Sequence, residues 1–399
     1  MGDDLEHGAA STNWPLIALV FAGAVTASVH IGKVPPALPD IRAELSVGLV
    51  AAGWIVSIFA LIGTMGGIFA GLVTDRLGHA RMIKGALLAF AAGGVLGAVG
   101  ETSTSLLVSR VIEGSAYIVL AVATPSLIAV LAAPRDRNLA VGLYGMGVPF
   151  GMSIALLASP PIIGAIGWRG LWWSVVGLSL VMLFLMLLFV RVPPGSRGPQ
   201  TTSFLRDIGL TISRPGPNIL MGCFLTYTAQ WTAVMAWLPT FIVEQREASL
   251  GVASVMTALV VMMNIGGNWL GSVLLHRGVP RWALISAGTL AMGLTALAFF
   301  PEGLPDMVRY GLCLAFSLFG GMQPASLTSG APAHAPSPDQ LGTTNGYWMQ
   351  GSQLGQLLGA PAVAAVVTIS GGWALAGPAL ALGTVLNVIL ALWLRKLER

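Results

Sequence analysis

Two apolar stretches of this 399-residue chain each carry ionisable side chains at helical spacing. His30 and Lys33 lie three residues apart in the first stretch, and Arg110 and Glu113 lie three residues apart in the second. Residues at this spacing sit one above the other on a helix, so Arg110 and Glu113 can form an ion pair. A charge inside an apolar helix is costly and usually serves a pathway for ions, protons or substrate. These four side chains therefore predict a site that binds a charged solute or moves a proton.

The chemistry of this site has open alternatives. Glu113 is the one acidic side chain well inside a predicted helix, so it is either the proton-coupling residue or a neutralising partner of Arg110. Lys33 either faces a cavity or extends its ammonium to the nearby membrane surface. His30 lies deeper and is either a ligand-binding or a packed residue. Three basic groups against one Glu113 favour an anionic solute, and we predict that His30, Lys33 and Arg110 bind it.

Neutral polar side chains on other predicted helices extend the candidate substrate-binding set. Tyr117 continues the face of Glu113 one turn further on. A buried amide or hydroxyl needs a hydrogen-bond partner, and lipid offers none. Each such group therefore either joins neighbouring helices or binds a polar ligand. The set comprises Tyr117, Tyr144, Tyr227, Gln230, Trp231, Gln323, Gln350 and Gln353.

The elements that must position these side chains are membrane-spanning helices. The chain is 55% hydrophobic and 9% charged, whereas a soluble protein is roughly 25% charged. A spanning helix needs about 20 mostly apolar residues. We predict an all-α membrane protein with twelve such helices, at 14–38, 47–73, 82–100, 105–132, 139–165, 168–193, 217–243, 250–275, 281–300, 307–332, 343–370 and 373–394.

An internal repeat divides these helices into two halves. Residues 66–81 return as 266–281 with six of the sixteen positions identical. A repeat at half the chain length predicts two related six-helix bundles in the same orientation, at 1–193 and 217–399. The polar stretch 194–216 between them is a cytoplasmic linker. The second copy has Leu275 where the first has Asp75, so an acidic contact is expected only in the first.

The basic residues orient the chain. If the N-terminus is cytoplasmic, 14 of the 20 Lys and Arg residues fall on that side, which the positive-inside rule favours. Both termini are then cytoplasmic, and the net charge of +4 needs no nucleic-acid partner. The acidic N-terminus lacks the basic region of a signal peptide, so the first helix is retained. Cys223 and Cys313 lie inside predicted helices as packing residues, and no motif calls for a metal or another cofactor.

Two motifs are similar to those of the major facilitator superfamily, and the resemblance covers nearly the whole chain. Residues 71–81, GLVTDRLGHAR, resemble the family's G-x-L-A-D-R-x-G-R-K motif, and 110–114, RVIEG, resemble its R-x-x-Q-G pattern with Glu in the Gln position. The resemblance implies that the first motif latches the two halves in the outward-facing state. The gating residues so implied are Gly71, Asp75, Arg76, Gly78 and Arg81.

The same resemblance implies a central cavity lined by the first, fourth, seventh and tenth helices, and a monomer. The first half, with Trp54 and Ser57 after Pro39-Asp40-Ile41, is similar to cyanate and nitroimidazole transporter-type members. We therefore expect a secondary active transporter of a small organic or inorganic anion, working by alternating access in the bacterial inner membrane and coupled to protons. The alternative is a proton-coupled exporter of drugs or metabolites. A membrane enzyme or sensor is the remote alternative, because neither a catalytic constellation nor a signalling domain is visible.

Overall fold

The computed structural model describes residues 11–190, 204–337 and 341–398. Its helices form two compact units. The first unit holds 11–33 and 69–190, and the second holds 34–68 together with the described residues from 204 onward.

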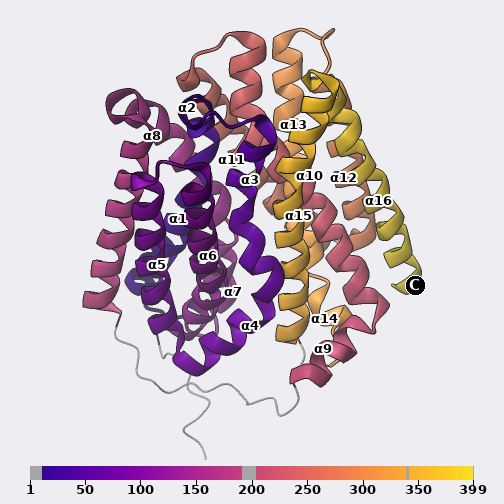
Figure 1. The fold of residues 1–399 in the computed structure, drawn as a ribbon. Helices are drawn as coiled ribbons and strands as arrows, with labels where there is room; N and C mark the ends of the chain where they lie inside the picture. Colours follow the sequence, from indigo (N-terminus) through magenta and orange to yellow (C-terminus); the bar gives the residue numbers. More distant parts are fainter. Residues whose placement is uncertain (1–10, 191–203, 338–340, 399) are drawn as a thin grey trace, which may run out of the picture. The chain divides into compact units, whose positions relative to one another are not determined.

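Four long helices make up most of the first unit, and they lie side by side (Figure 1). They are α1 (Trp14–Gly32), α5 (His79–Val99), α6 (Ser103–Leu131) and α8 (Gly147–Phe189), and the short α7 (Arg137–Tyr144) joins α6 to α8. Small residues bring α1 close to α8. A Cβ added to Gly32 would lie 2.8 Å from the Cβ of Ala155, and one added to Gly151 would lie 2.5 Å from that of Ser28. Close backbone approach of this kind is how membrane helices pack.

Two interruptions shape the helices of the first unit. α8 is broken at Ile166 and Gly167, where Gly167 has a φ of +71° that favours glycine. This break separates the two spans predicted at 139–165 and 168–193. α1 ends at Gly32, and Lys33 occupies the junction before α2 (Val34–Leu45).

The second unit is built around α10, which packs on α15, while α13 packs on both α11 and α12. α16 packs on α10 and α12. The unit's elements are α2, α3 (Leu49–Ser57), η1 (Ile58–Ala60), the start of α4 (Leu61–Leu77), α9 (Phe204–Ile212), α10 (Pro215–Arg246), α11 (Leu250–His276), α12 (Arg281–Phe299), α13 (Asp306–Thr328), α14 (Ala331–His334), α15 (Leu341–Ser370), η3 (Trp373–Leu375) and α16 (Ala376–Leu397).

Residues 34–68 belong to the second unit, although the helix that precedes them in the sequence belongs to the first. α3 lies against α15, where a Cβ on Gly53 would come within 3.0 Å of the Pro361 Cα. α2 is tied to α10 by an ion pair of 3.0 Å between Arg42 and Glu244. The division into bundles at 1–193 and 217–399 stays a prediction, and part of the linker lies outside the described residues.

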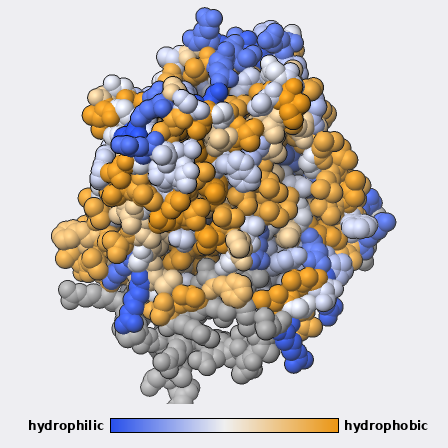
Figure 2. All heavy atoms as spheres, viewed as in Figure 1, coloured by the Kyte–Doolittle hydropathy of each residue, from blue (hydrophilic) through white to orange (hydrophobic). Residues whose placement is uncertain are grey.

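The surfaces of the helices fit a bilayer. Ten helical stretches in the described part of the chain are long and apolar enough to cross a membrane. One of them, Leu139–Phe189, contains the break at Gly167, and α13 is a further helix of 23 residues. Apolar side chains cover the middle of the helices, and polar ones gather towards their ends (Figure 2). Cys223 and Cys313 are both free and buried, which confirms that they are packing residues.

Candidate functional site

His30, Lys33, Arg110 and Glu113 form one cluster inside the first unit, and none of the four exposes any surface. Glu113 Oε1 lies 2.6 Å from Lys33 Nζ and 2.8 Å from His30 Nδ1. Glu113 Oε2 accepts a hydrogen bond from Arg110 Nη1, which also donates to the His30 carbonyl oxygen at 2.9 Å. The two helices predicted to share a site, α1 and α6, therefore do bring these side chains together. Glu113 pairs with Lys33 as well as with Arg110.

Lys33 points into the unit and does not extend to the membrane surface. Its Nζ lies 4.4 Å from the centroid of the Trp172 ring on α8. An ammonium over an aromatic face is attracted by the ring's negative face. The alternative in which Lys33 extends to the membrane surface is wrong in this structure, because the side chain is fully buried between Glu113 and Trp172.

The His30 ring is held on three sides. Phe90 of α5 stacks on it with 4.3 Å between ring centroids. Its Nδ1 faces Glu113, and its Nε2 lies 2.9 Å from the Oγ of Ser179 on α8. Ser179 Oγ is also 3.0 Å from the carbonyl oxygen of Val175. The ring orientation is thus fixed by stacking and by a hydrogen bond at each nitrogen.

Glycines of α5 allow its neighbours to come this close. A Cβ on Gly94 would lie 2.6 Å from Val176 Cγ2 on α8. A Cβ on Gly97 would lie 2.5 Å from Trp172 Nε1 and 2.6 Å from the Oγ of Ser109 on α6. Larger residues at these positions would push α6 and α8 apart, and the cluster would lose its geometry.

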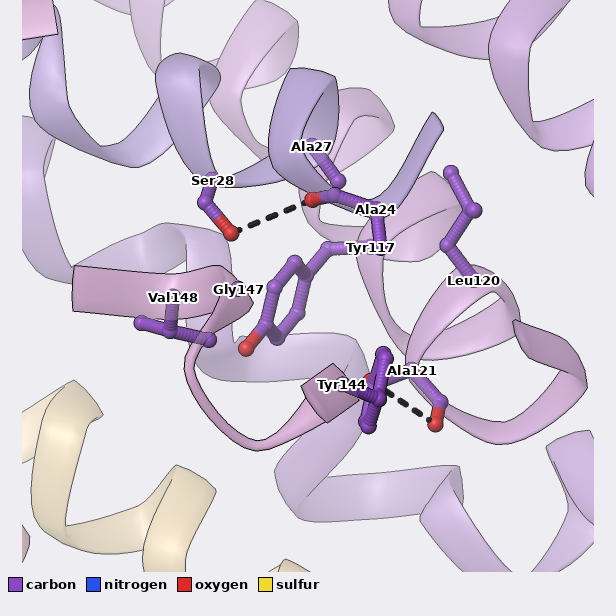
Figure 3. Close-up of a pocket in the computed structure, with 9 residues that line it drawn as sticks. All are labelled: Ala24, Ala27, Ser28, Tyr117, Leu120, Ala121, Tyr144, Gly147 and Val148. Atoms are coloured by element: carbon purple, nitrogen blue, oxygen red, sulfur yellow. Dashed lines mark hydrogen bonds between the residues drawn. The ribbon is translucent and has the colours of Figure 1, made fainter. Parts of the chain in front are cut away.

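A small pocket of about 10 Å³, which is room for about one water molecule, lies beside the cluster in the same unit. The Tyr117 ring occupies the middle of its lining, with Tyr144 close by (Figure 3). The Tyr144 hydroxyl donates to the carbonyl oxygen of Ala121 at 3.1 Å, and the Ser28 hydroxyl donates to that of Ala24 at 3.2 Å. The full lining is Ala24, Ala27, Ser28, Tyr117, Leu120, Ala121, Tyr144, Gly147 and Val148.

The pocket and the cluster lie one helical turn apart on two shared helices. Ala27 precedes His30 by three residues on α1, and Tyr117 follows Glu113 by four on α6. One turn corresponds to roughly 5–6 Å along each axis. Counted over its four residues, the cluster carries one net positive charge when His30 is neutral and two when it is protonated. The apolar pocket therefore lies in the field of a buried positive charge.

The tyrosine and tryptophan predicted on α10 contact neighbouring helices of the second unit. The Trp231 indole donates to Ser317 Oγ of α13 at 3.2 Å. The Tyr227 hydroxyl lies 3.3 Å from the side-chain amide of Asn264 on α11. These contacts join α10 to α11 and α13, so in this structure the groups serve helix packing.

The predicted glutamines of the second unit are also held between helices. Gln230 donates to the Thr226 carbonyl oxygen at 3.0 Å and accepts from the Thr384 hydroxyl at 2.9 Å. Gln323 donates to the Ile285 carbonyl oxygen at 3.0 Å. Two further residues lie on α15: Gln353 is buried against Gly63, and Gln350 is half-buried. Their role in binding a substrate stays a prediction.

The repeated segment can be compared only in part. Gly78 has a φ of +89°, which requires glycine at the turn before α5, and Arg81 is exposed. The surroundings of Gly71, Asp75 and Arg76 lie outside the described residues.

Arg281, the last residue of the second repeat copy, contacts an acid from another part of the chain. Arg281 pairs with Glu398 beyond the end of α16, and it donates to the Ser329 carbonyl oxygen at 3.0 Å. His334 Nε2 lies 3.0 Å from the same Glu398 carboxylate. This pair does not involve Leu275, so the expectation of an acidic latch in the first copy alone stays a prediction.

The sequence did not predict that Ser179 and Trp172 contact the cluster, or that Ser28 lines the pocket. Ser179 and Trp172 are single residues in a very apolar span, and only the packing of α8 against α1 gives them a role. Ser28 lies two residues from His30 and therefore on another face of the helix. No pattern in the sequence distinguishes these residues from ordinary helix-packing residues.

The arrangement of long apolar helices, with a charged cluster buried between the first and fourth predicted spans, agrees with the comparison to known families. The sequence profile of the Major Facilitator Superfamily matches residues 16–338. The chain belongs to the Major Facilitator Superfamily. The members of this family are multi-pass membrane transporters, and not enzymes.

Curated relatives include transporters of several bacteria. The 3-(3-hydroxy-phenyl)propionate transporter of Escherichia coli K12 is 29% identical over 69% of this chain and 68% of its own length. The inner membrane transport protein YdhP of E. coli K12 is 26% identical over 90% of each chain. Two uncharacterized MFS-type transporters of Mycobacterium tuberculosis are 32% identical over 46% of this chain, which spans only 26% of their length.

A solved structure confirms the predicted fold class. The crystal structure of a bacterial homolog of the human lysosomal transporter Spinster matches with a TM-score of 0.76, covering 97% of this chain and 96% of that one. The identity is 17%, so the likeness concerns the fold alone. Nothing in these comparisons tests the similarity to cyanate and nitroimidazole transporters, which stays a prediction.

Proposed function

We propose that this transporter moves a small organic anion with an apolar or aromatic body by alternating access, coupled to protons. The observation that carries the proposal is the pairing of a net positive, fully buried cluster with an apolar, tyrosine-lined pocket one turn away. The helices that line the pocket would move apart in the transport cycle to admit the body of the solute, because the pocket of about 10 Å³ is too small for it in this conformation, and the cluster would attract its negative charge. We also propose that the protein acts as a monomer in the inner membrane with both termini in the cytoplasm.

The charge of the cluster is large enough to select among solutes. One net positive charge roughly 10 Å from an anion attracts it by about 1.7 kcal/mol at an effective dielectric constant of about 20. This energy corresponds to a preference of about twentyfold for an anion over a neutral solute of the same shape. The printed name of the E. coli relative supports the class, because 3-(3-hydroxy-phenyl)propionate is a carboxylate on an aromatic body.

Proton coupling is proposed to depend on the carboxylate of Glu113. Lys33, His30 and Arg110 all converge on this one group, so its negative charge would stabilise a proton on the neighbouring His30. In the first repeat copy we propose the gating role for Gly71, Asp75, Arg76, Gly78 and Arg81.

Uptake into proteoliposomes tests the function. Purified protein should accumulate labelled 3-(3-hydroxyphenyl)propionate or a similar aromatic carboxylate when the interior is alkaline, and much less without a pH gradient. The corresponding amide should compete about twentyfold more weakly. Val148→Phe should block uptake because the added ring fills the pocket, whereas Val181→Phe changes an exposed residue of the same helix and should not. Equal competition by acid and amide would refute an anionic substrate.

Export of an apolar metabolite or drug is the second candidate, and the mostly apolar lining of the pocket favours it. The same vesicles separate the two. An exporter would release a preloaded apolar solute from the vesicles in exchange for protons. Added aromatic carboxylates would not inhibit this release.

A further inference from the structure

Ser179 contacts the charged cluster although it carries no charge itself. Its Oγ lies between two possible partners, His30 Nε2 at 2.9 Å and the Val175 carbonyl oxygen at 3.0 Å. Ser179 and His30 are both fully buried, so water does not compete for these bonds. A serine has one hydroxyl hydrogen, and it can donate to only one of the two partners at a time.

The contacts of His30 decide which nitrogen carries its hydrogen. Nδ1 lies 2.8 Å from Glu113 Oε1 and 3.3 Å from Lys33 Nζ, so its shorter contact is with an acceptor, and two bare acceptors would repel each other at 2.8 Å. Nδ1 therefore carries a hydrogen and donates it to the carboxylate. When the ring is neutral, Nε2 is bare and must accept from the Ser179 hydroxyl. When the ring is protonated, Nε2 carries a hydrogen too and donates it to Ser179 Oγ.

We infer that Ser179 is a positioning residue that keeps its hydrogen bond to His30 Nε2 whether or not the ring carries the coupling proton. When the transport cycle opens the cluster to water, His30 Nε2 takes the proton from a hydronium ion, which leaves as water. In the closed cluster the Ser179 hydroxyl hydrogen then points to the Val175 carbonyl oxygen and no longer to Nε2. Release reverses both steps. The hydrogen bond between His30 and Ser179 exists in either state with its direction reversed, whereas Ser179 donates to the Val175 carbonyl oxygen only when the ring is protonated.

The charged neighbours of His30 link this proton to the solute. Lys33 faces it from its own helix, and Glu113 and Arg110 face it from α6, while its neighbours on α5 and α8 are Phe90 and Ser179. Protonation raises the charge of the cluster from one to two positive charges in a buried site, which is unfavourable. An anion in the adjacent pocket offsets the second charge, so proton and anion bind together. This inference rests on the proposed anion transport, but the state of the ring can be measured without it.

Nitrogen NMR of protein labelled with ¹⁵N-histidine measures that state directly. The His30 signals are assigned by their loss in His30→Gln. In the unaltered protein the neutral ring should carry its hydrogen on Nδ1, and a neutral ring with its hydrogen on Nε2 would overturn the inference. In Ser179→Ala the protonated ring loses a charge-assisted bond and the neutral ring a weaker one, so His30 should bind its proton about fivefold more weakly.

Matched variants separate this effect from a structural one. Ser174→Ala removes the same type of bond from the same helix, to the Gly170 carbonyl oxygen at 2.8 Å, and should leave the His30 titration unchanged. Ser179→Thr keeps a hydroxyl, so His30 should bind its proton in this variant as tightly as in the unaltered protein. A His30 titration in Ser179→Ala equal to that in Ser174→Ala would refute the role of Ser179 even if uptake is proton-driven. Loss of all proton dependence of uptake in the unaltered protein would instead refute the proposed function.

Discussion

The charge balance of the buried cluster gives the sharpest test of its energetics. Glu113→Gln removes the only negative charge among the four residues and leaves Lys33 and Arg110 buried without it. Removing one partner of a buried ion pair typically costs about 3–5 kcal/mol. For a unit of this size, each kcal/mol lowers the unfolding midpoint by roughly 2–4 °C. The midpoint of Glu113→Gln should therefore fall by about 10 °C.

A second substitution should rescue the first. Lys33→Met alone leaves Glu113 with Arg110 and His30 and balances the charge, so we expect a change within about 1 kcal/mol. The double variant Lys33→Met with Glu113→Gln has the same net charge as the unaltered cluster. It should regain at least about 1 kcal/mol relative to Glu113→Gln, since neighbouring residues are not additive.

Gel filtration of fluorescent fusions after heating in detergent measures these midpoints. Glu244→Gln is the control, because it breaks the 3.0 Å pair with Arg42 at a site where the Glu244 side chain is 40% exposed. Such a pair contributes under about 1 kcal/mol. The reasoning fails if Glu113→Gln is as stable as Glu244→Gln, or if the double variant is no more stable than Glu113→Gln.

Three further outcomes are expected. Tyr144→Phe removes the hydroxyl that fixes the pocket wall and should weaken substrate affinity about fivefold in uptake assays, while Tyr310→Phe, which loses a similar bond to a backbone carbonyl elsewhere, should not. Asp75→Asn should nearly abolish uptake and Leu275→Asn should reduce it far less; equal losses would contradict the asymmetry of the repeat. Glu398→Gln should lower the heating midpoint by a few degrees, because this acid holds the arginine of the second repeat copy, and an unchanged midpoint would make that contact irrelevant to stability.

The fold could be predicted from the sequence because lipid imposes a simple rule. Every backbone polar group must be satisfied within its own segment, so long apolar runs become helices wherever they occur. The break at Gly167 falls between two predicted spans for the same reason, since the apolar pattern is interrupted there. The pairing of Arg110 with Glu113 is also local, because their three-residue spacing places them on one helix face.

The tertiary structure alone decided what those charges do. Whether Lys33 reaches the membrane surface or Glu113 depends on how α1 packs against α6 and α8, and small residues such as Gly32 set its approach to α8. The acid that pairs with Arg281 lies more than a hundred residues away at Glu398, so the repeat pattern could not reveal it. Ser179 is likewise an ordinary serine in its own helix. Contacts between helices depend on packing, and a single sequence records the faces of each helix but not their partners.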